Sequence, residues 1–191
     1  MWSEKLHRHR GKCVVFSAPS GGGKSTVIGA LCEMDQSLEY SVSVTTRSPR
    51  SGEQEGIDYY YLSKDAFKKK ILEDAFLEWA EVHGEFYGTL RNEIERRMSQ
   101  GKIILLDIDV QGGLAVKRSI PEALLIFLYP PSWEVLESRL RNRGTETMET
   151  LRTRLEAARR ETEVGRQYDF HVINQDIKET VLDVFTIINK G

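Results

Sequence analysis

Eight consecutive residues near the N-terminus combine glycines, a lysine and a hydroxyl group in a spacing that can hold an anion. They are Ala18, Pro19, Ser20, Gly21, Gly22, Gly23, Lys24 and Ser25. Glycines let successive backbone N–H groups converge on one anion, and a helix that begins there adds its positive N-terminal end. In the pattern GxxxxGK[ST], the lysine reaches the β- and γ-phosphates of a nucleoside triphosphate and the hydroxyl binds Mg²⁺. Only Ala18, in place of the first glycine, departs from that pattern, so the sequence predicts a P-loop.

A pair of carboxylates follows a second apolar segment. Residues 103–106 read Ile-Ile-Leu-Leu and are followed by Asp107, with Asp109 two residues further on. In an extended chain these two side chains face the same way. P-loop enzymes place a carboxylate near magnesium, so Asp107 is predicted to share a metal site with Ser25. Because aspartate is also a common turn residue, this prediction depends on the P-loop.

Two arginines, Arg47 and Arg50, lie in a turn that Pro49 restrains. Guanidinium groups bind phosphate through two parallel hydrogen bonds, which suits a phosphate monoester. Tyr59 and Tyr87 could add hydroxyl donors. A surface turn with solvated arginines explains this segment equally well, so the residues alone leave both alternatives open.

The rest of the chain alternates short apolar runs with helical patterns. Buried strands are predicted at residues 13–16, 103–106, 124–129 and 171–173. Helices are predicted at residues 27–34, 93–100, 132–143, 148–163 and 177–188. The strand and helix around the glycine-rich turn are the context that a P-loop requires. This alternation predicts an α/β fold of the P-loop NTPase type, with a parallel sheet covered by helices on both faces.

Two stretches stand apart from this alternation. Residues 41–88 are polar, aromatic and turn-rich, with half-exposed strand patterns and a helical pattern at 65–73, and they predict a small mixed lobe inserted into the core. The arginine-rich stretch 139–160 predicts a second, mobile insertion. Its alternative is a solvated helix whose arginines are paired with glutamates.

Composition limits the possible partners. The 191 residues suit one compact domain, and a net charge of −2 gives no global field toward nucleic acid or a membrane. The basic N-terminus is interpreted as a solvated leader, and no stretch approaches the ~20 apolar residues of a membrane span. Two cysteines without metal-ligand spacing fit a reducing cytoplasm.

Further segments occur along the chain in a specific order and spacing. They comprise residues 17–21, 23–26, 41–43, 45–47, 49–50, 52–53, 58–59, 78–80, 87–88, 106–112, 139–140, 143–146 and 173–174. Together they resemble the guanylate kinases, P-loop nucleoside monophosphate kinases that phosphorylate GMP. Alanine is also found in that family at the position of Ala18.

The resemblance implies a GMP-binding role for eight residues. They are Ser43, Arg47, Arg50, Tyr59, Glu78, Tyr87, Thr89 and Asp109. Glu78 would accept hydrogen bonds from N1–H and the exocyclic N2 amine of guanine, whereas adenine offers an acceptor in place of N1–H. Ser43 and Thr89 would donate to O6, and the arginines and tyrosines would hold the phosphate. Asp107 would lie near Mg²⁺ and Asp109 near the base. Without the resemblance, Glu78 would be interpreted as a solvated acid.

The resemblance also implies residues for ATP and for catalysis. ATP would be bound by Ala18 to Thr26 and by Asn174, near its adenine. The catalytic residues would be Lys24, Arg139, Arg143 and Arg154, the arginines belonging to a lid that neutralises charge on the transferring phosphoryl group. The implied division assigns residues 11–40, 90–137 and 168–191 to the core, 41–89 to a GMP-binding lobe and 138–167 to the lid.

The expected reaction converts ATP and GMP, and also dGMP, into the corresponding diphosphates in purine nucleotide metabolism, with Mg²⁺ and in the cytoplasm. Neither nucleic acid nor a membrane is expected as a partner, and monomer and homodimer both stay open. One alternative is a non-catalytic interaction module, which would tend to lose Lys24 or the lid arginines. A P-loop kinase acting on a phosphorylated sugar is the other, and it would not need the set of Ser43, Glu78 and Thr89.

Overall fold

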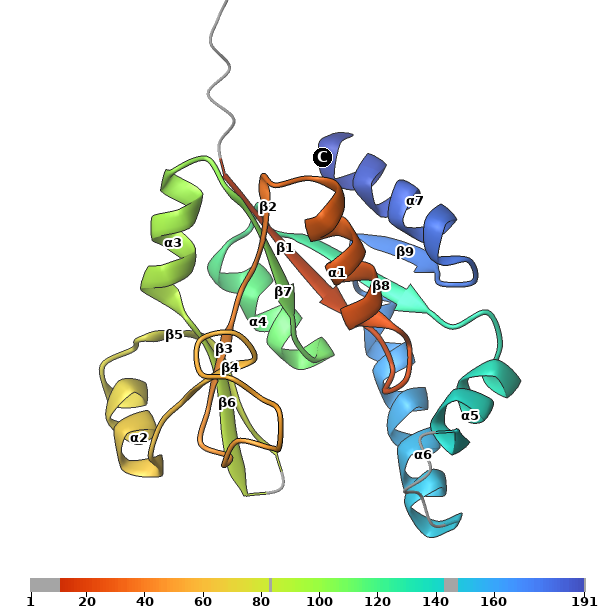
Figure 1. Ribbon diagram of the computed structural model, residues 1–191, viewed down its shortest axis with the longest axis horizontal. Coiled ribbons are helices and arrows are strands. Elements are labelled where there is room, and N and C mark those ends of the chain that lie inside the picture. The colour runs from red at the N-terminus through yellow and green to blue at the C-terminus, as the bar shows by residue number, and fades with distance from the viewer. Residues whose placement is uncertain (1–10, 83, 143–147, 191) are drawn as a thin grey trace, which may run out of the picture.

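The computed structural model describes residues 11–82, 84–142 and 148–190. Its centre is a sheet in which all neighbouring strands are parallel (Figure 1). In spatial order the strands are β2 (Leu38–Tyr40), β7 (Ile103–Asp107), β1 (Lys12–Ser17), β8 (Leu124–Tyr129) and β9 (Phe170–Ile173). The carboxyl ends of parallel strands meet at one edge of a sheet, so the residues that follow β1, β7 and β9 come together there.

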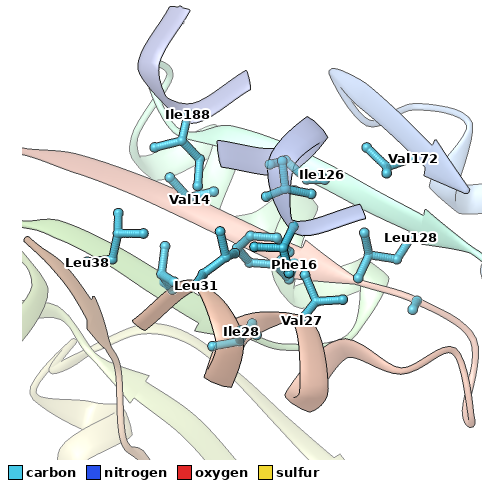
Figure 2. Packing of buried hydrophobic residues seen from close by; sticks show 14 residues of the cluster. Val14, Phe16, Val27, Ile28, Leu31, Leu38, Ile126, Leu128, Val172 and Ile188 are labelled. Atoms are coloured by element: carbon cyan, nitrogen blue, oxygen red, sulfur yellow. The ribbon is translucent and has the colours of Figure 1, made fainter. Parts of the chain in front are cut away.

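Both faces of this sheet are covered by helices. On one face lie α1 (Lys24–Met34) and α7 (Ile177–Lys190), whose apolar side chains pack on the strands (Figure 2). The helices of the other face are α3 (Arg91–Ser99), α4 (Val110–Ser119) and α6 (Met148–Gly165). Along β1, Val14 and Phe16 belong to the first layer and Cys13 and Val15 to the second. This alternation is typical of a strand buried on both faces.

A second, smaller sheet forms between β2 and α3, and we call it the mixed lobe together with its helix. In spatial order its strands are β4 (Tyr59–Tyr61), β3 (Ser43–Thr45), β6 (Glu85–Leu90) and β5 (Phe76–Val82), and its helix is α2 (Lys64–Leu72). β3 and β4 are parallel, whereas β6 is antiparallel to both β3 and β5. The lobe has its own core, formed by Val44, Phe67, Phe76 and Phe86.

α5 (Trp133–Arg141) and α6 form a helical pair beside the glycine-rich turn (Figure 1). Ser132 caps α5, because its hydroxyl accepts a backbone N–H of the first turn. Leu136 and Leu140 are fully buried against α6. A Cβ atom placed on Gly21 would lie 3.2 Å from Cδ2 of Leu140. The apolar side of α5 therefore packs directly on the P-loop.

The predicted strands and helices of the core are present, with boundaries within a few residues of those expected. The helix expected at 132–143 ends at Arg141, and residues 143–147 lie outside the described part of the chain. β2, β6 and α4 were not predicted. β2 has only three residues, and α4 contains Gly112 and Gly113, which weaken a helical pattern. Among the described helices, none combines the length and the apolar character that crossing a membrane requires.

Candidate active site

The P-loop connects β1 to α1 in the conformation that its glycines permit. Gly21 and Gly23 have φ angles of 84° and 89°, in the left-handed region that a side chain disfavours. Ala18 is not among the described non-glycine residues with positive φ, so alanine is tolerated at the first position of the motif. No side chain caps α1, which begins at Lys24. The first N–H groups of α1 are therefore available to an anion.

The three groups predicted for the metal and the phosphates lie together at the carboxyl edge of the sheet. The Ser25 hydroxyl donates to Oδ2 of Asp107 over 3.2 Å. Nζ of Lys24 lies 3.6 Å from Oδ1 of Asp107 and 3.3 Å from the carbonyl oxygen of Ala18, to which it donates. Hydroxyl and carboxylate oxygens are the ligands that Mg²⁺ prefers, so this pair fits the predicted ion.

Five of the eight predicted GMP-binding residues line a cavity of about 250 Å³ between the mixed lobe and β7, whereas Arg47, Arg50 and Thr89 are not among its lining residues. Its lining includes Ser43, Tyr59, Glu78, Tyr87, Asp107 and Asp109. Glu78 is only 9% exposed, and the buried Thr89 hydroxyl donates to its Oε1 over 2.6 Å. Burial raises the pKa of the Glu78 carboxyl to about 7, the hydrogen bonds from Thr89 lower it, and the charge of Asp109 raises it. The carboxylate is thus an enclosed, directional acceptor.

Asp109 lies beside this cavity as the N-cap of α4. Its Oδ1 accepts the backbone N–H groups of Gln111 and Gly112, each over 2.8 Å. A Cβ atom on Gly112 would lie 3.0 Å from Oε2 of Glu78. The first turn of α4 therefore fixes Asp109 and leaves the space that the Glu78 carboxylate occupies.

The arginine turn is more ordered than a solvated loop. Arg47 donates to both carboxylate oxygens of Glu53, over 2.8 Å and 3.0 Å, and its guanidinium lies 5.4 Å from the ring centroid of Tyr59. Glu53 also accepts the Tyr61 hydroxyl and the backbone N–H of Arg50. The Arg47 guanidinium, followed by the backbone N–H of Arg50 and the Tyr61 hydroxyl, lowers the pKa of Glu53 to about 2. Glu53 and Tyr61 were not predicted as site residues, although an acid three residues after Arg50 was a signal.

The predicted adenine contact, Asn174, lies under the P-loop. Its side chain is buried, and Nδ2 donates to the carbonyl oxygen of Gly22 over 2.8 Å. It also lines a cavity of about 480 Å³ with Gly21, Gly23, Thr26, Arg139, Gln175, Asp176 and Ile177. The sequence offered no sign of the contact with Gly22, because the two residues are 152 positions apart.

The predicted lid arginines are placed unequally. Arg139 lies on α5 beside the P-loop, where Nη2 donates to the backbone carbonyl of Asn174 over 3.4 Å. Arg154 lies on α6 and is half-buried. Arg143 is outside the described residues. Among these arginines, the structure thus brings Arg139 to the P-loop.

Two groups near the site were missed, one buried and one half-buried. Tyr168, which follows α6, shares a 2.7 Å hydrogen bond with Ser17, and Ser17 donates to the carbonyl oxygen of Ile108 over 2.8 Å. These contacts hold the turn between Asp107 and α4. Glu161 on α6 is half-buried, and burial raises its pKa against the opposing charge of Lys24.

A glycine-rich loop between a central parallel strand and a helix, at the carboxyl edge of the sheet, defines the class of P-loop nucleotide-binding proteins. A family model described as guanylate kinase matches residues 10–191. The chain therefore belongs to the guanylate kinase family.

Individual relatives agree with this assignment. The guanylate kinase of Polaromonas sp. is 45% identical over 179 residues, covering 94% of this chain and 87% of that protein. That of Fusobacterium nucleatum subsp. nucleatum is 45% identical over 181 residues, covering 95% of this chain and 97% of that protein. The crystal structure of guanylate kinase from Anaplasma phagocytophilum matches with a TM-score of 0.78 and 34% identity, over 95% of this chain and 86% of that one.

Proposed function

We propose that this protein transfers the terminal phosphoryl group of ATP to GMP, giving ADP and GDP. The observation that carries the proposal is the buried Glu78 carboxylate, which accepts the Thr89 hydroxyl and lines a cavity that Asp107 also lines. A buried carboxylate matches the two adjacent N–H donors of guanine and rejects adenine, whose acceptor would face it. Unpaired buried polar groups penalise the wrong base, which can give discrimination of about 10⁴-fold.

The chain itself contributes charge stabilisation and alignment. Lys24 and the first N–H groups of α1 would stabilise negative charge on the transferring phosphoryl group, and Arg139 would add a second positive charge from α5. Arg47 and Arg50, with Tyr59 and Tyr87, would hold the GMP phosphate in line. The acceptor is already an anionic phosphate oxygen, so no general base is required.

We propose that Ser25 and Asp107 hold Mg²⁺, since both present oxygen ligands at one point of the site. Bound there, the ion would supply positive charge that offsets the negative charge of the ATP phosphates. We further propose acceptance of dGMP and a cytoplasmic role in purine nucleotide metabolism. The proposed mobile parts are the lobe at residues 41–89 and the lid at 138–167, around a core of 11–40, 90–137 and 168–191.

The test is a coupled ADP-release assay with ATP, Mg²⁺ and each of GMP, AMP, CMP and UMP. We expect turnover with GMP alone, and a loss of roughly 100-fold in kcat/KM for GMP in Glu78→Gln, because the amide cannot accept both N–H groups. Glu81→Gln is the matched control, since Glu81 lies on the same strand but is exposed.

Three contrary outcomes would each overturn a different part of the proposal. Turnover of the four nucleotides without base preference would indicate a P-loop kinase that recognises only the phosphate. ATP binding without any turnover would indicate a non-catalytic interaction module. Unaltered GMP kinetics in Glu78→Gln would remove this residue from the base site.

A further inference from the structure

Asn174 is held in a fixed position at the end of β9. Its backbone N–H donates to the carbonyl oxygen of Tyr129, over 2.7 Å, which continues the pairing of β8 with β9. Its side chain is 6% exposed and extends from this edge of the sheet toward the P-loop. The side chain that contacts the loop is thus anchored to the rigid core.

The contact falls on one peptide plane of the P-loop. Nδ2 of Asn174 donates to the Gly22 carbonyl over 2.8 Å in a buried environment. That carbonyl shares a rigid trans peptide with the N–H of Gly23, so fixing one fixes the other, which points the opposite way. A Cβ atom on Gly23 would collide with Nδ2 of Asn174, so the loop and the amide are in close contact. Asn174 thereby orients an N–H group of the phosphate cradle.

We propose that Asn174 is a positioning residue for the triphosphate and acts through the peptide between Gly22 and Gly23 rather than by contacting adenine. Its backbone carbonyl also accepts a hydrogen bond from Nη2 of Arg139 over 3.4 Å. Asn174 therefore connects both the P-loop and the Arg139 guanidinium of α5 to the end of β9. The inference deepens the proposed function, because it concerns the same nucleotide site. It requires only that the P-loop binds phosphates.

The test compares a nucleotide with an anion that has no base. Binding of ATP and of inorganic tripolyphosphate, both with Mg²⁺, is measured by calorimetry for the wild type and for Asn174→Ala. Removing the donor leaves the buried Gly22 carbonyl unpaired and the peptide free to rotate. We expect both dissociation constants to rise by the same factor, about tenfold, while KM for GMP stays within about twofold.

Two further variants separate positioning from folding. Asn174→Leu keeps the branching of the side chain and removes the donor, and it should weaken both ligands like Asn174→Ala. The matched control is Asn189→Ala on α7, where Nδ2 also donates to a backbone carbonyl, that of Phe185, over 2.9 Å. We expect this control to bind both ligands like the wild type.

The outcomes distinguish the alternatives. Weaker binding of ATP with unchanged tripolyphosphate would assign Asn174 to the adenine and overturn the proposal. A lower Tm with both dissociation constants unchanged would show a structural role only and would also overturn it. Equal weakening of both ligands in an enzyme that does not phosphorylate GMP would support the role of Asn174 and refute the proposed function instead.

Discussion

The charge of Glu78 is sensitive to pH near neutrality, because burial raises its pKa to about 7. Guanine needs the ionised form, which alone can accept both N–H groups. As the pH falls through about 7 the carboxyl takes up a proton, and we expect kcat/KM for GMP to fall by up to about tenfold per pH unit. The measurement is a pH profile of kcat/KM between pH 5.5 and 8.5, a range that extends about 1.5 pH units to either side of the pKa.

A variant isolates this effect from the titration of the substrate, whose phosphate has its own pKa of about 6. The Glu78→Gln enzyme retains the titration of GMP and lacks that of the carboxyl. We therefore expect the step near pH 7 to disappear in the variant. A step of equal size in both enzymes would assign it to another group.

Glu53 is expected to act on GMP through Arg47. Its carboxylate holds the Arg47 guanidinium with two hydrogen bonds, so Glu53→Ala should leave that arginine in many conformations. We expect KM for GMP to rise by about tenfold with a smaller change in kcat, since binding of the phosphate is affected more than the chemical step. Steady-state kinetics with varied GMP give both constants. Glu55→Ala is the control, and an equal rise in its KM would contradict a specific role of Glu53.

Among the helices, α1 and α6 are expected to differ in how an added methyl group at a glycine changes the stability of the fold. A Cβ atom added to Gly29, inside α1, would meet no described atom within 4 Å apart from the backbone of its own helix. At Gly165, the last residue of α6, the ring of Phe127 already occupies the space that a Cβ atom would need. We expect Gly29→Ala to stabilise the fold by about 0.5–1 kcal/mol through helix propensity. Gly165→Ala should destabilise it by about 1–3 kcal/mol through overpacking. Thermal unfolding of both variants provides the measurement, and shifts of the same sign would refute the argument.

Strands and helices were predicted from the sequence more accurately than the contacts between side chains. Apolar runs such as residues 103–106 predict strands because burial on both faces removes polar residues from them. The P-loop was recognisable because its strand, turn and helix are contiguous. β2 and α4 were missed, since three residues or a pair of glycines carry too weak a period.

Contacts made by the fold were harder to foresee than the residues that make them. Glu78 meets Thr89 only because β5 and β6 pair in that register. Asn174 and Gly22 were both predicted as site residues, but the hydrogen bond between them was not, because it depends on where β9 ends beside β8 and the P-loop. The type of a residue can be predicted from a motif, whereas its partner follows from the topology.

At the scale of the whole molecule, residues of α1 and of the mixed lobe line a cavity of about 500 Å³. Ile28, Gly29 and Cys32 line one side and Ile57 the other, where Ile57 is 63% exposed. If GMP draws the lobe toward the core, these surfaces should approach each other. We expect oxidative cross-linking of Ile57→Cys to the native Cys32 to accelerate several-fold with GMP present.

The cross-link is read as a mobility shift on non-reducing gels. Cys13 should not compete, because it is 1% exposed and burial raises the pKa of its thiol to about 12. Leu72→Cys is the control, since Leu72 is 89% exposed at the end of α2. Cross-linking of Ile57→Cys at the same rate with and without GMP would argue against closure.

The register of β1 has a consequence for how the chain is made. Val14 of β1 pairs with Leu105 on one side and Leu124 on the other, whereas the strands of the mixed lobe pair among themselves between residues 43 and 90. Synthesis proceeds from the N-terminus, so the lobe has all its partners before β1 has any. During translation, the apolar strand β1 therefore remains unpaired while the mixed lobe, which follows it in the chain, folds. A ribosome that stalls before residue 103 leaves β1 exposed to aggregation or to a chaperone.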